Sequence, residues 1–187
     1  MATTADIKNG LAIELEGQLF IISEFQHVKP GKGGAFVRTR LKNMITGRVI
    51  ERTLRSGEKI EIAQIEDRPM QYLYREGEDF VFMDQETFEQ INVSGAVVSD
   101  GWRFLKEAEV ATVTFHQDKP IVVTLPFFIN FKIVDCEPGV RGDTVSNVTK
   151  PAKLATGAVV QVPLFIEQGE IIRVDTRTGT YLERARD

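Results

Sequence analysis

Short runs in which apolar and polar residues alternate, divided by glycine or proline, recur along almost the whole chain. Clear examples start at Leu11, Met70 and Phe127. A period of two residues is typical of a β-strand with one buried face, and short strands separated by turns favour a β-barrel or β-sandwich. The longest apolar run, residues 121–129, is interrupted by a threonine and a proline and falls well short of the roughly 18 residues of a membrane-spanning helix. The sequence therefore predicts an all-β protein without a membrane span.

The 187 residues are expected to form three small β-barrels, over residues 1–63, 64–126 and 127–187. The second segment opens at Asp67-Arg68-Pro69, where proline disfavours a helix in the preceding residue and suits a joint between domains. A unit of about 60 residues buries only about 60% of the surface of its unfolded chain. Each barrel is therefore expected to pack on its neighbour.

In the first segment, the strand predicted over residues 35–41 places Arg38 and Arg40 on one face and Val37 and Leu41 on the other. Together with the strands on either side, this strand gives a barrel of five or six strands. Two interpretations of the arginine face are open. It contacts the phosphates of a nucleic acid, or it simply faces solvent.

In the second segment, Met70, Tyr72 and Tyr74 alternate as one face of a strand. A short helix is expected to follow from Asp84, whose carboxylate can cap a helix N-terminus. Phe88 and Ile91 are three residues apart and would share one face of that helix.

In the third segment, four residues alternate cleanly as the buried face of a strand: Phe127, Ile129, Phe131 and Ile133. Residues 160–166 and 170–174 supply two further apolar strands, with turn residues between them. A small barrel is again the expected result.

Charge is spread unevenly over the three segments. The net charge of the whole chain is −4, and the segments carry +3, −7 and 0 in chain order. A basic first segment is suited to phosphate, whereas an acidic middle segment would face away from a nucleic acid or meet a basic protein. The alternative is that charge varies along a solvated surface without a partner.

The most informative segment for function is the glycine-rich loop around Lys32, between two predicted strands. Pro30 fixes its own φ, and Gly31, Gly33 and Gly34 leave nothing bulky beside the lysine. The loop lacks the Gly-Lys-Ser/Thr ending of a Walker phosphate loop. At neutral pH a lysine amine is a cation, which suits phosphate oxygens and makes it a poor general base. The alternative is a mobile hairpin tip with a solvated lysine.

The sequence has too few cysteines and histidines for disulfide bonding, for zinc binding and for Ser-His-Asp catalysis. Cys136 is the only cysteine, which excludes an internal disulfide and every multi-cysteine metal site. The two histidines, His27 and His116, lie far apart in the sequence, so zinc and Ser-His-Asp chemistry are not expected. We expect no catalytic residue, metal or cofactor, and structural roles for His27 and Cys136. The N-terminus has no secretory signal, so a cytoplasmic location is expected.

Three ordered blocks of the sequence resemble bacterial elongation factor P, a family related to the hypusine-containing translation factor of archaea and eukaryotes. The first block is the Lys-Pro-Gly-Lys-Gly loop with the arginine-bearing strand, Lys29–Arg40. The second covers Arg68–Tyr74, Val81–Asp84 and Glu86–Gln90. The third comprises Gly139, Gly142-Asp143-Thr144, Lys150–Ala152, Thr156-Gly157, Val162–Ile166, Gly169-Glu170, Val174–Arg177, Gly179 and Tyr181. The resemblance runs essentially from end to end.

The resemblance implies an SH3-like (KOW-like) first barrel and two OB-fold barrels in an L-shaped arrangement similar to tRNA. It implies a translation elongation factor that binds the ribosome between the peptidyl and exit tRNA sites and promotes peptide-bond formation at consecutive prolines. The implied partners are the ribosome and its rRNA, the peptidyl-tRNA, the exit-site mRNA codon and an enzyme that modifies Lys32. A monomer without an active site of its own is expected.

The resemblance also implies roles for particular residues. Lys32 would reach the CCA end of the peptidyl-tRNA, and in many members of the family this lysine is extended covalently. The residues that would shape its loop are Pro30, Gly31, Gly33 and Gly34. The residues that would contact tRNA or the ribosome are Arg38, Arg40, Gly142, Asp143, Thr144, Tyr181 and Arg184.

Each of these roles has a plainer alternative in the residues themselves. Gly142-Asp143-Thr144 also fits an Asx-type turn, Tyr181 fits an aromatic packed at a barrel rim, and Arg184 fits a solvated charge. Three other functions compete for the whole chain. A divergent paralogue would lack the lysine, an OB module for single-stranded RNA conflicts with the acidic middle segment, and an enzyme would need a nucleophile and base that the sequence does not supply.

Overall fold

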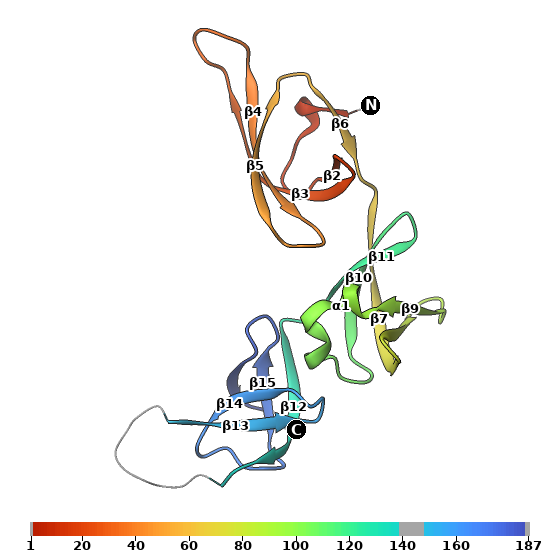
Figure 1. The fold of residues 1–187 in the computed structure, drawn as a ribbon, viewed down its shortest axis with the longest axis vertical. Coiled ribbons are helices and arrows are strands. Elements are labelled where there is room, and N and C mark those ends of the chain that lie inside the picture. Colours follow the sequence, from red (N-terminus) through yellow and green to blue (C-terminus); the bar gives the residue numbers. More distant parts are fainter. Residues whose placement is uncertain (1, 139–147, 186–187) are drawn as a thin grey trace. The chain divides into compact units, whose positions relative to one another are not determined.

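The structure is a computed structural model that describes residues 2–138 and 148–185 (Figure 1). Its strands form three sheets, which confirms the all-β prediction. The chain divides into two compact units, one of Met1–Asp67 with Thr114–Val122 and one of Arg68–Val113 with Val123–Asp187. The domain boundaries at residues 63/64 and 126/127 stay a prediction. No helix in the described ranges is long and apolar enough to cross a membrane.

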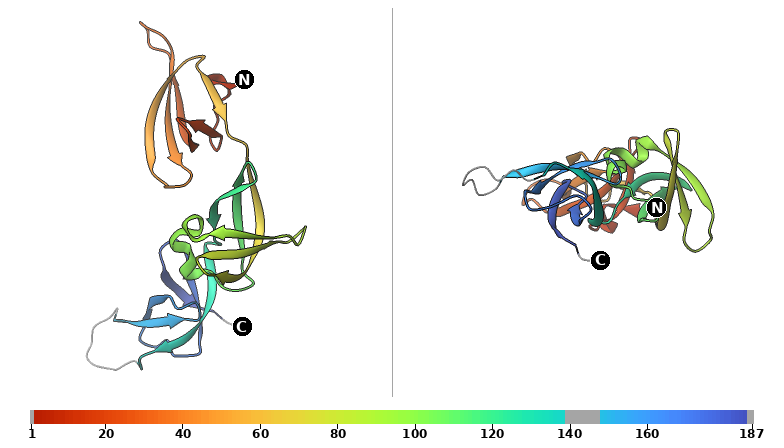
Figure 2. Two further views of the ribbon diagram at one scale, coloured as in Figure 1. Left: turned by 45° about the vertical axis from the view of Figure 1, so that its right-hand side comes forward. Right: turned by 90° about the horizontal axis from the view of Figure 1, so that it is seen from below.

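The first sheet has six strands in the order β1-β6-β2-β3-β4-β5 and curls into a barrel (Figure 1). Its strands are β1 (Ala2–Thr3), β2 (Ala12–Leu15), β3 (Gln18–Val28), β4 (Phe36–Asn43), β5 (Val49–Arg55) and β6 (Lys59–Ile62). A 3₁₀ turn, η1 (Thr4–Asp6), follows β1 and is capped by Thr3. Side chains in β4 alternate strictly between interior and solvent, with Val37 and Leu41 fully buried. The β3–β4 hairpin extends beyond the other strands of this barrel (Figure 2).

The hairpin of β10 and β11 carries residues that belong with the first unit. Its Ile121 packs against a small cluster formed by Ala12, Leu19 and Ala63. Nearby, Thr114 Oγ1 donates a 2.6 Å hydrogen bond to Asp67 Oδ1. The first unit is therefore assembled from two stretches that are far apart in the sequence.

The second sheet has five strands in the order β11-β10-β7-β8-β9. Its strands are β7 (Ile65–Glu76), β8 (Asp79–Asp84), β9 (Gln90–Ser94), β10 (Val110–His116) and β11 (Lys119–Thr124). Met70 and Tyr72 are buried as predicted, but Tyr74 is 48% exposed. The strand pairing shifts between Tyr72 and Tyr74, so a bulge turns Tyr74 to the other side of the strand. The prediction of one face for all three residues was wrong for this reason.

The helix expected from Asp84 is absent, and a turn joins β8 to β9 instead. Asp84 Oδ1 accepts hydrogen bonds from the backbone N–H groups of Glu86 and Thr87 at 2.8 and 3.0 Å. These bonds lower the pKa of the Asp84 carboxyl. Phe88 has a φ of +61°, outside the α-helical region, and its side chain is 69% exposed instead of packed. Aspartate thus stabilises an Asx turn here, a role that competes with helix capping.

The helices of this segment lie after β9 instead, as α1 (Gly95–Val98) and the 3₁₀ helix η2 (Ser99–Phe104). Glycine is required at the start of α1, because a Cβ on Gly95 would lie 2.7 Å from the carbonyl oxygen of Glu78. The close approach allows the Gly95 N–H to donate to that oxygen at 3.1 Å. Asp100 and Gly101 lie within η2.

The third sheet has five strands in the order β14-β13-β12-β15-β16. Its strands are β12 (Phe128–Cys136), β13 (Thr149–Leu154), β14 (Val159–Pro163), β15 (Ile171–Asp175) and β16 (Thr180–Arg184). The core contains Ile129, Phe131 and Ile133 as predicted, whereas Phe127 precedes the strand and is 53% exposed. Cys136 is partly buried against this core, in keeping with a structural role.

Candidate functional site

Lys32 lies in the loop that closes the β3–β4 hairpin. The last pair of the ladder joins Val28 to Phe36, and the residues between them form an irregular turn. Gly33 has a φ of +107°, a conformation that glycine adopts without strain, and a Cβ on it would lie 4.0 Å from Pro30 Cγ. Lys32 is exposed and forms no ion pair or hydrogen bond with any described residue. The glycine-rich tip of the loop therefore presents the Lys32 cation to solvent.

The glycines on either side of Lys32 leave open space around it. Gly31 and Gly34 are exposed, have ordinary φ values, and would meet no atom within 4 Å if they carried a Cβ. These two glycines contribute to the loop because they lack a side chain, and not because they adopt an unusual backbone conformation. A narrow tip of this kind can enter a confined space that a broader loop could not.

Aromatic contacts support the base of this loop. The ring of His27 packs edge-on against Phe25 at a centroid distance of 5.5 Å. On the neighbouring strand, the guanidinium of Arg38 lies 5.7 Å from the centre of the Phe36 ring. Both contacts restrict side chains next to the loop, in keeping with the structural role expected for His27.

Arg38 and Arg40 lie on the outer face of β4, as the alternation predicts, but they have different neighbours. Arg40 is paired across the sheet with Glu24 and Glu51, at 3.3 and 3.7 Å. Arg38 is flanked across the sheet by the uncharged residues Gln26 and Thr53. The positive charge of Arg40 is therefore largely compensated, and Arg38 is the more available cation for a phosphate.

In the third barrel, Tyr181 and Arg184 lie on β16, at the edge of the sheet. Tyr181 packs partly against the barrel core, and burial raises the pKa of its hydroxyl. The Arg184 guanidinium lies 3.1 Å from Glu170 Oε1 and 5.7 Å from the centre of the Phe165 ring. Phe165 is 63% exposed. Neither Phe165 nor Glu170 was predicted as a neighbour of Arg184, because only the folded register brings them together.

Gly142, Asp143 and Thr144 lie outside the described residues. On the strands that flank them, Lys150 is 5% exposed and its Nζ donates a 2.6 Å hydrogen bond to the carbonyl oxygen of Glu137. A buried ammonium needs such a partner, since burying it unpaired is costly. In the sequence Lys150 stands out only as part of a motif, although the alternation of β13 places it on the same buried face as Ala152 and Leu154.

The predicted contact residues that the structure describes are cations and one tyrosine, which can bind and position a partner through charge and hydrogen bonds. No group of three or more His, Cys, Asp or Glu side chains in the described ranges could hold a metal ion. The predicted contact residues also lie in separate places, with Lys32, Arg38 and Arg40 in the first barrel and Tyr181 and Arg184 in the third.

Family models for elongation factor P match the chain in three places. They are the elongation factor P KOW-like domain over residues 3–60, the elongation factor P OB domain over residues 65–123, and the elongation factor P C-terminal domain over residues 129–184.

Curated relatives match over the full length. An elongation factor P from Coprothermobacter proteolyticus is 53% identical over 98% of this chain and 99% of its own. One from Paenarthrobacter aurescens is 52% identical over the whole of both chains.

Solved structures share the fold at lower sequence identity. A eukaryotic translation initiation factor 5A from Methanococcus jannaschii has a TM-score of 0.54 and 22% identity, covering 66% of this chain and 91% of its own. An eIF-5A family protein from Naegleria fowleri has the same TM-score at 14% identity, covering 66% of this chain and 96% of its own. Taken with the full-length relatives and the three domain matches, the chain belongs to the elongation factor P family of translation elongation factors.

Proposed function

We propose that this protein binds the ribosome between the peptidyl and exit tRNA sites and promotes peptide-bond formation at consecutive prolines. The observation that supports this most directly is the exposed, unpaired Lys32 at the end of the β3–β4 hairpin. A cation on a narrow extended tip is suited to reach the phosphates of the CCA end of a peptidyl-tRNA. Covalent extension of Lys32 by a modifying enzyme would add reach and hydrogen-bond donors.

The mechanism is positioning, without a catalytic side chain or cofactor. Proline restricts its own φ, and a prolyl substrate therefore spends little time in the reactive geometry. Holding the CCA end in place removes orientational freedom, an effect worth up to roughly 7–11 kcal/mol in ideal cases and much less on a ribosome that already orients its substrates. Lys32 supplies charge and contact, and the ribosome supplies the chemistry.

The remaining contacts are distributed along the protein, which would act as a cytoplasmic monomer. Arg38 is suited to tRNA phosphates because it forms no ion pair with a carboxylate of the described residues, and Arg40 would add to it if Glu24 were displaced. Tyr181 and Arg184 would contact the small subunit or tRNA. Residues 142–144 would approach the exit-site codon, and rRNA would surround the bound protein.

Reconstituted translation of a message with three consecutive prolines tests this function. We expect the wild-type protein to raise the rate on that message and leave a message without prolines unchanged. Lys32→Ala should abolish the stimulation and leave stability unchanged, because the side chain packs against nothing. Lys29→Ala is the matched control, since it removes an equal charge from the same loop. Full stimulation by a folded Lys32→Ala protein would contradict the proposal.

A further inference from the structure

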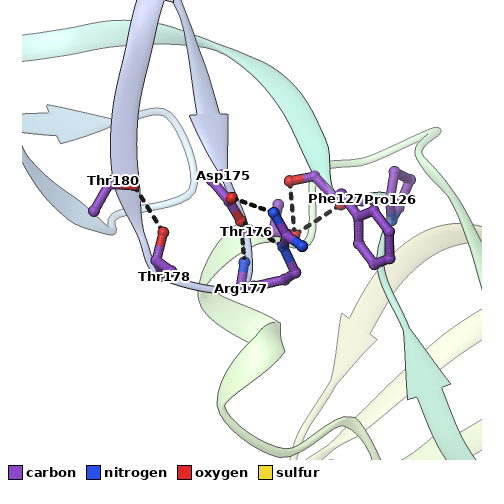
Figure 3. Close-up of polar contacts among 7 residues, drawn as sticks. All are labelled: Pro126, Phe127, Asp175, Thr176, Arg177, Thr178 and Thr180. Carbon is purple, nitrogen blue, oxygen red and sulfur yellow. Dashed lines mark hydrogen bonds and ion pairs between the residues drawn. The ribbon is translucent and has the colours of Figure 1, made fainter.

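The segment that leads into the third barrel is tied to the turn between β15 and β16. The backbone N–H of Thr176 donates to the carbonyl oxygen of Phe127 at 2.9 Å, and Thr176 Oγ1 donates to that of Pro126 at 2.7 Å (Figure 3). Two consecutive carbonyls of the connecting segment therefore find their partners on one residue of the turn. A flexible linker would leave such groups to water.

The turn itself is held in one conformation by an ion pair. Asp175 is 7% exposed and accepts hydrogen bonds from Arg177, at 3.0 Å from Nε and 2.6 Å from Nη2 (Figure 3). The same guanidinium lies 4.6 Å from the centre of the Phe127 ring. Arg177 thus joins the turn to the connecting segment through a cation–π contact as well as through charge.

The η2 helix of the middle segment contacts the third barrel directly. The Phe104 ring packs against the third-barrel core, with its centroid 6.1 Å from that of Phe131. A Cβ on Gly179 would lie 3.2 Å from Phe104 Cζ, so this glycine allows the ring to approach the turn. Thr156 Oγ1 also donates a 2.7 Å hydrogen bond to the carbonyl oxygen of Arg103.

These contacts come from separate parts of the third barrel and converge on η2 and the connecting segment. We call this set the interbarrel joint, formed by Phe104, Thr156, Thr176, Arg177 and Gly179. Rotation of the third barrel about the connecting segment would expose Phe104 and break several hydrogen bonds at once. Contacts of this kind hold one arrangement rather than a continuum of arrangements.

We infer that the interbarrel joint is a positioning element, which makes η2 with its sheet and the third barrel tumble as one rigid body. The joint thereby holds Tyr181 and Arg184 of the third barrel at a fixed distance from η2 and its sheet. The functional half of this inference rests on the proposed function. A binding surface that already has its bound arrangement in the free protein loses no conformational entropy on binding. A freely hinged surface loses conformational entropy when it is ordered, and its affinity is lower for that reason. Phe104, Thr156 and Arg177 would therefore act on ribosome affinity without touching the ribosome.

The physical half is tested by ¹⁵N relaxation of the full-length protein. We expect amides of residues 70–113 and of the described third barrel to share one rotational correlation time. The double variant Phe104→Ser with Thr156→Val should lose this shared value while the amide shifts of the two sheets stay dispersed. Thr178→Val is the control, because its hydroxyl contacts only Thr180, at 2.7 Å, among the described residues. Two different correlation times in the wild-type protein, or one shared value in the double variant, would overturn the inference.

The functional half is tested by titrating each variant into the three-proline translation assay. The double variant should need about tenfold more protein for half-maximal stimulation, the factor expected if the bound arrangement is occupied one-tenth of the time. Its maximal rate should equal that of the wild type, and Phe104→Leu should restore the affinity by restoring the apolar contact. A loss of maximal rate with unchanged affinity would overturn the positioning role.

The two proposals fail separately. If Lys32→Ala keeps full activity, the proposed function is wrong, and the relaxation data still decide whether the joint is rigid. If the wild-type protein stimulates proline joining but the double variant has unchanged affinity, the positioning role is wrong and the proposed function stands. If the double variant loses shift dispersion in either sheet, the less polar double variant Phe104→Ala with Thr156→Val replaces it, and a shared correlation time in that folded variant also counts against the inference.

Discussion

The guanidinium of Arg40 lies 3.3 Å from the carboxylate of Glu24, its partner across the β3–β4 ladder. Two strand positions away on the same face, Arg38 is flanked by uncharged side chains. Neighbouring arginines of one strand therefore differ in the charge they present to a partner.

This difference predicts unequal effects on ribosome binding. Arg38→Gln should weaken binding and lower the slope of log affinity against log salt by about 0.7–0.9 for one lost phosphate contact. Arg40→Gln should change the slope less, because its charge is already offset by Glu24 and Glu51. Binding measured at several salt concentrations checks this, with wild-type protein as the reference. Equal slopes for the two variants would show that the ion pair does not matter.

Gly95→Ala should destabilise the fold, because the added Cβ would lie 2.7 Å from the Glu78 carbonyl oxygen. The backbone must then shift, and overpacking of this kind costs about 1–3 kcal/mol. Chemical denaturation monitored by circular dichroism measures the change in unfolding free energy. Gly34→Ala is the control, since a Cβ there meets open space. Equal unfolding free energies for Gly95→Ala and wild type would contradict the prediction, because they would mean that the start of α1 shifts away from Glu78 without cost.

Lys150→Met should also lower stability, while keeping most of the side-chain volume. The substitution leaves the Glu137 carbonyl oxygen without the ammonium that now donates to it at 2.6 Å. Glu137 is itself exposed, so water can reach its carbonyl, and the expected loss is that of one hydrogen bond to a charged group, about 1.5–3 kcal/mol. The unfolding free energy of the variant measures the loss, and Lys153→Met, an exposed lysine on the same strand, serves as its control. A stabilised Lys150→Met protein would show that the buried charge costs more than its hydrogen bond returns.

The ion pair of Asp175 with Arg177 predicts a dependence on acid. The hydrogen bond from Arg177 is the main cause that lowers the pKa of the Asp175 carboxyl. A group whose pKa is lower in the folded state adds stability above its unfolded pKa, about 3.9 for aspartate, and loses it as pH falls through the folded value. Wild type should therefore lose stability relative to Asp175→Asn as pH falls from about 6 toward that acidic range. Parallel stability curves for the two proteins across this range would count against the ion pair.

Much of the fold was predictable because strands with one buried face have a period of two. The alternation around Val37 and Ile129 gave the buried faces of β4 and β12 correctly. The same rule failed at Tyr74, because a bulge adds one residue to a strand and reverses the faces beyond it. Nothing in the residues from Met70 to Tyr74 marks that bulge.

The site was predictable where one short segment contains it, and less so where partners come from different strands. The loop around Lys32 is continuous in sequence, and its glycines and proline already indicate an open tip. The carboxylate partners of Arg40 and Arg184 became visible only with the strand register. In the sequence Phe104 is an ordinary apolar residue, because its contact with Phe131 depends on how η2 packs on the third barrel.

The small cluster that Ile121 completes has a consequence for synthesis of the chain. Its buried members, Ala12, Leu19 and Ala63, and the other side chains packed on them leave the ribosome well before residue 121 does. Domains fold as units while the chain is being made, from the N-terminus onward. The part of this apolar surface that Ile121 covers therefore stays exposed until the β10–β11 hairpin has emerged, and a fragment truncated at residue 63 would expose it permanently.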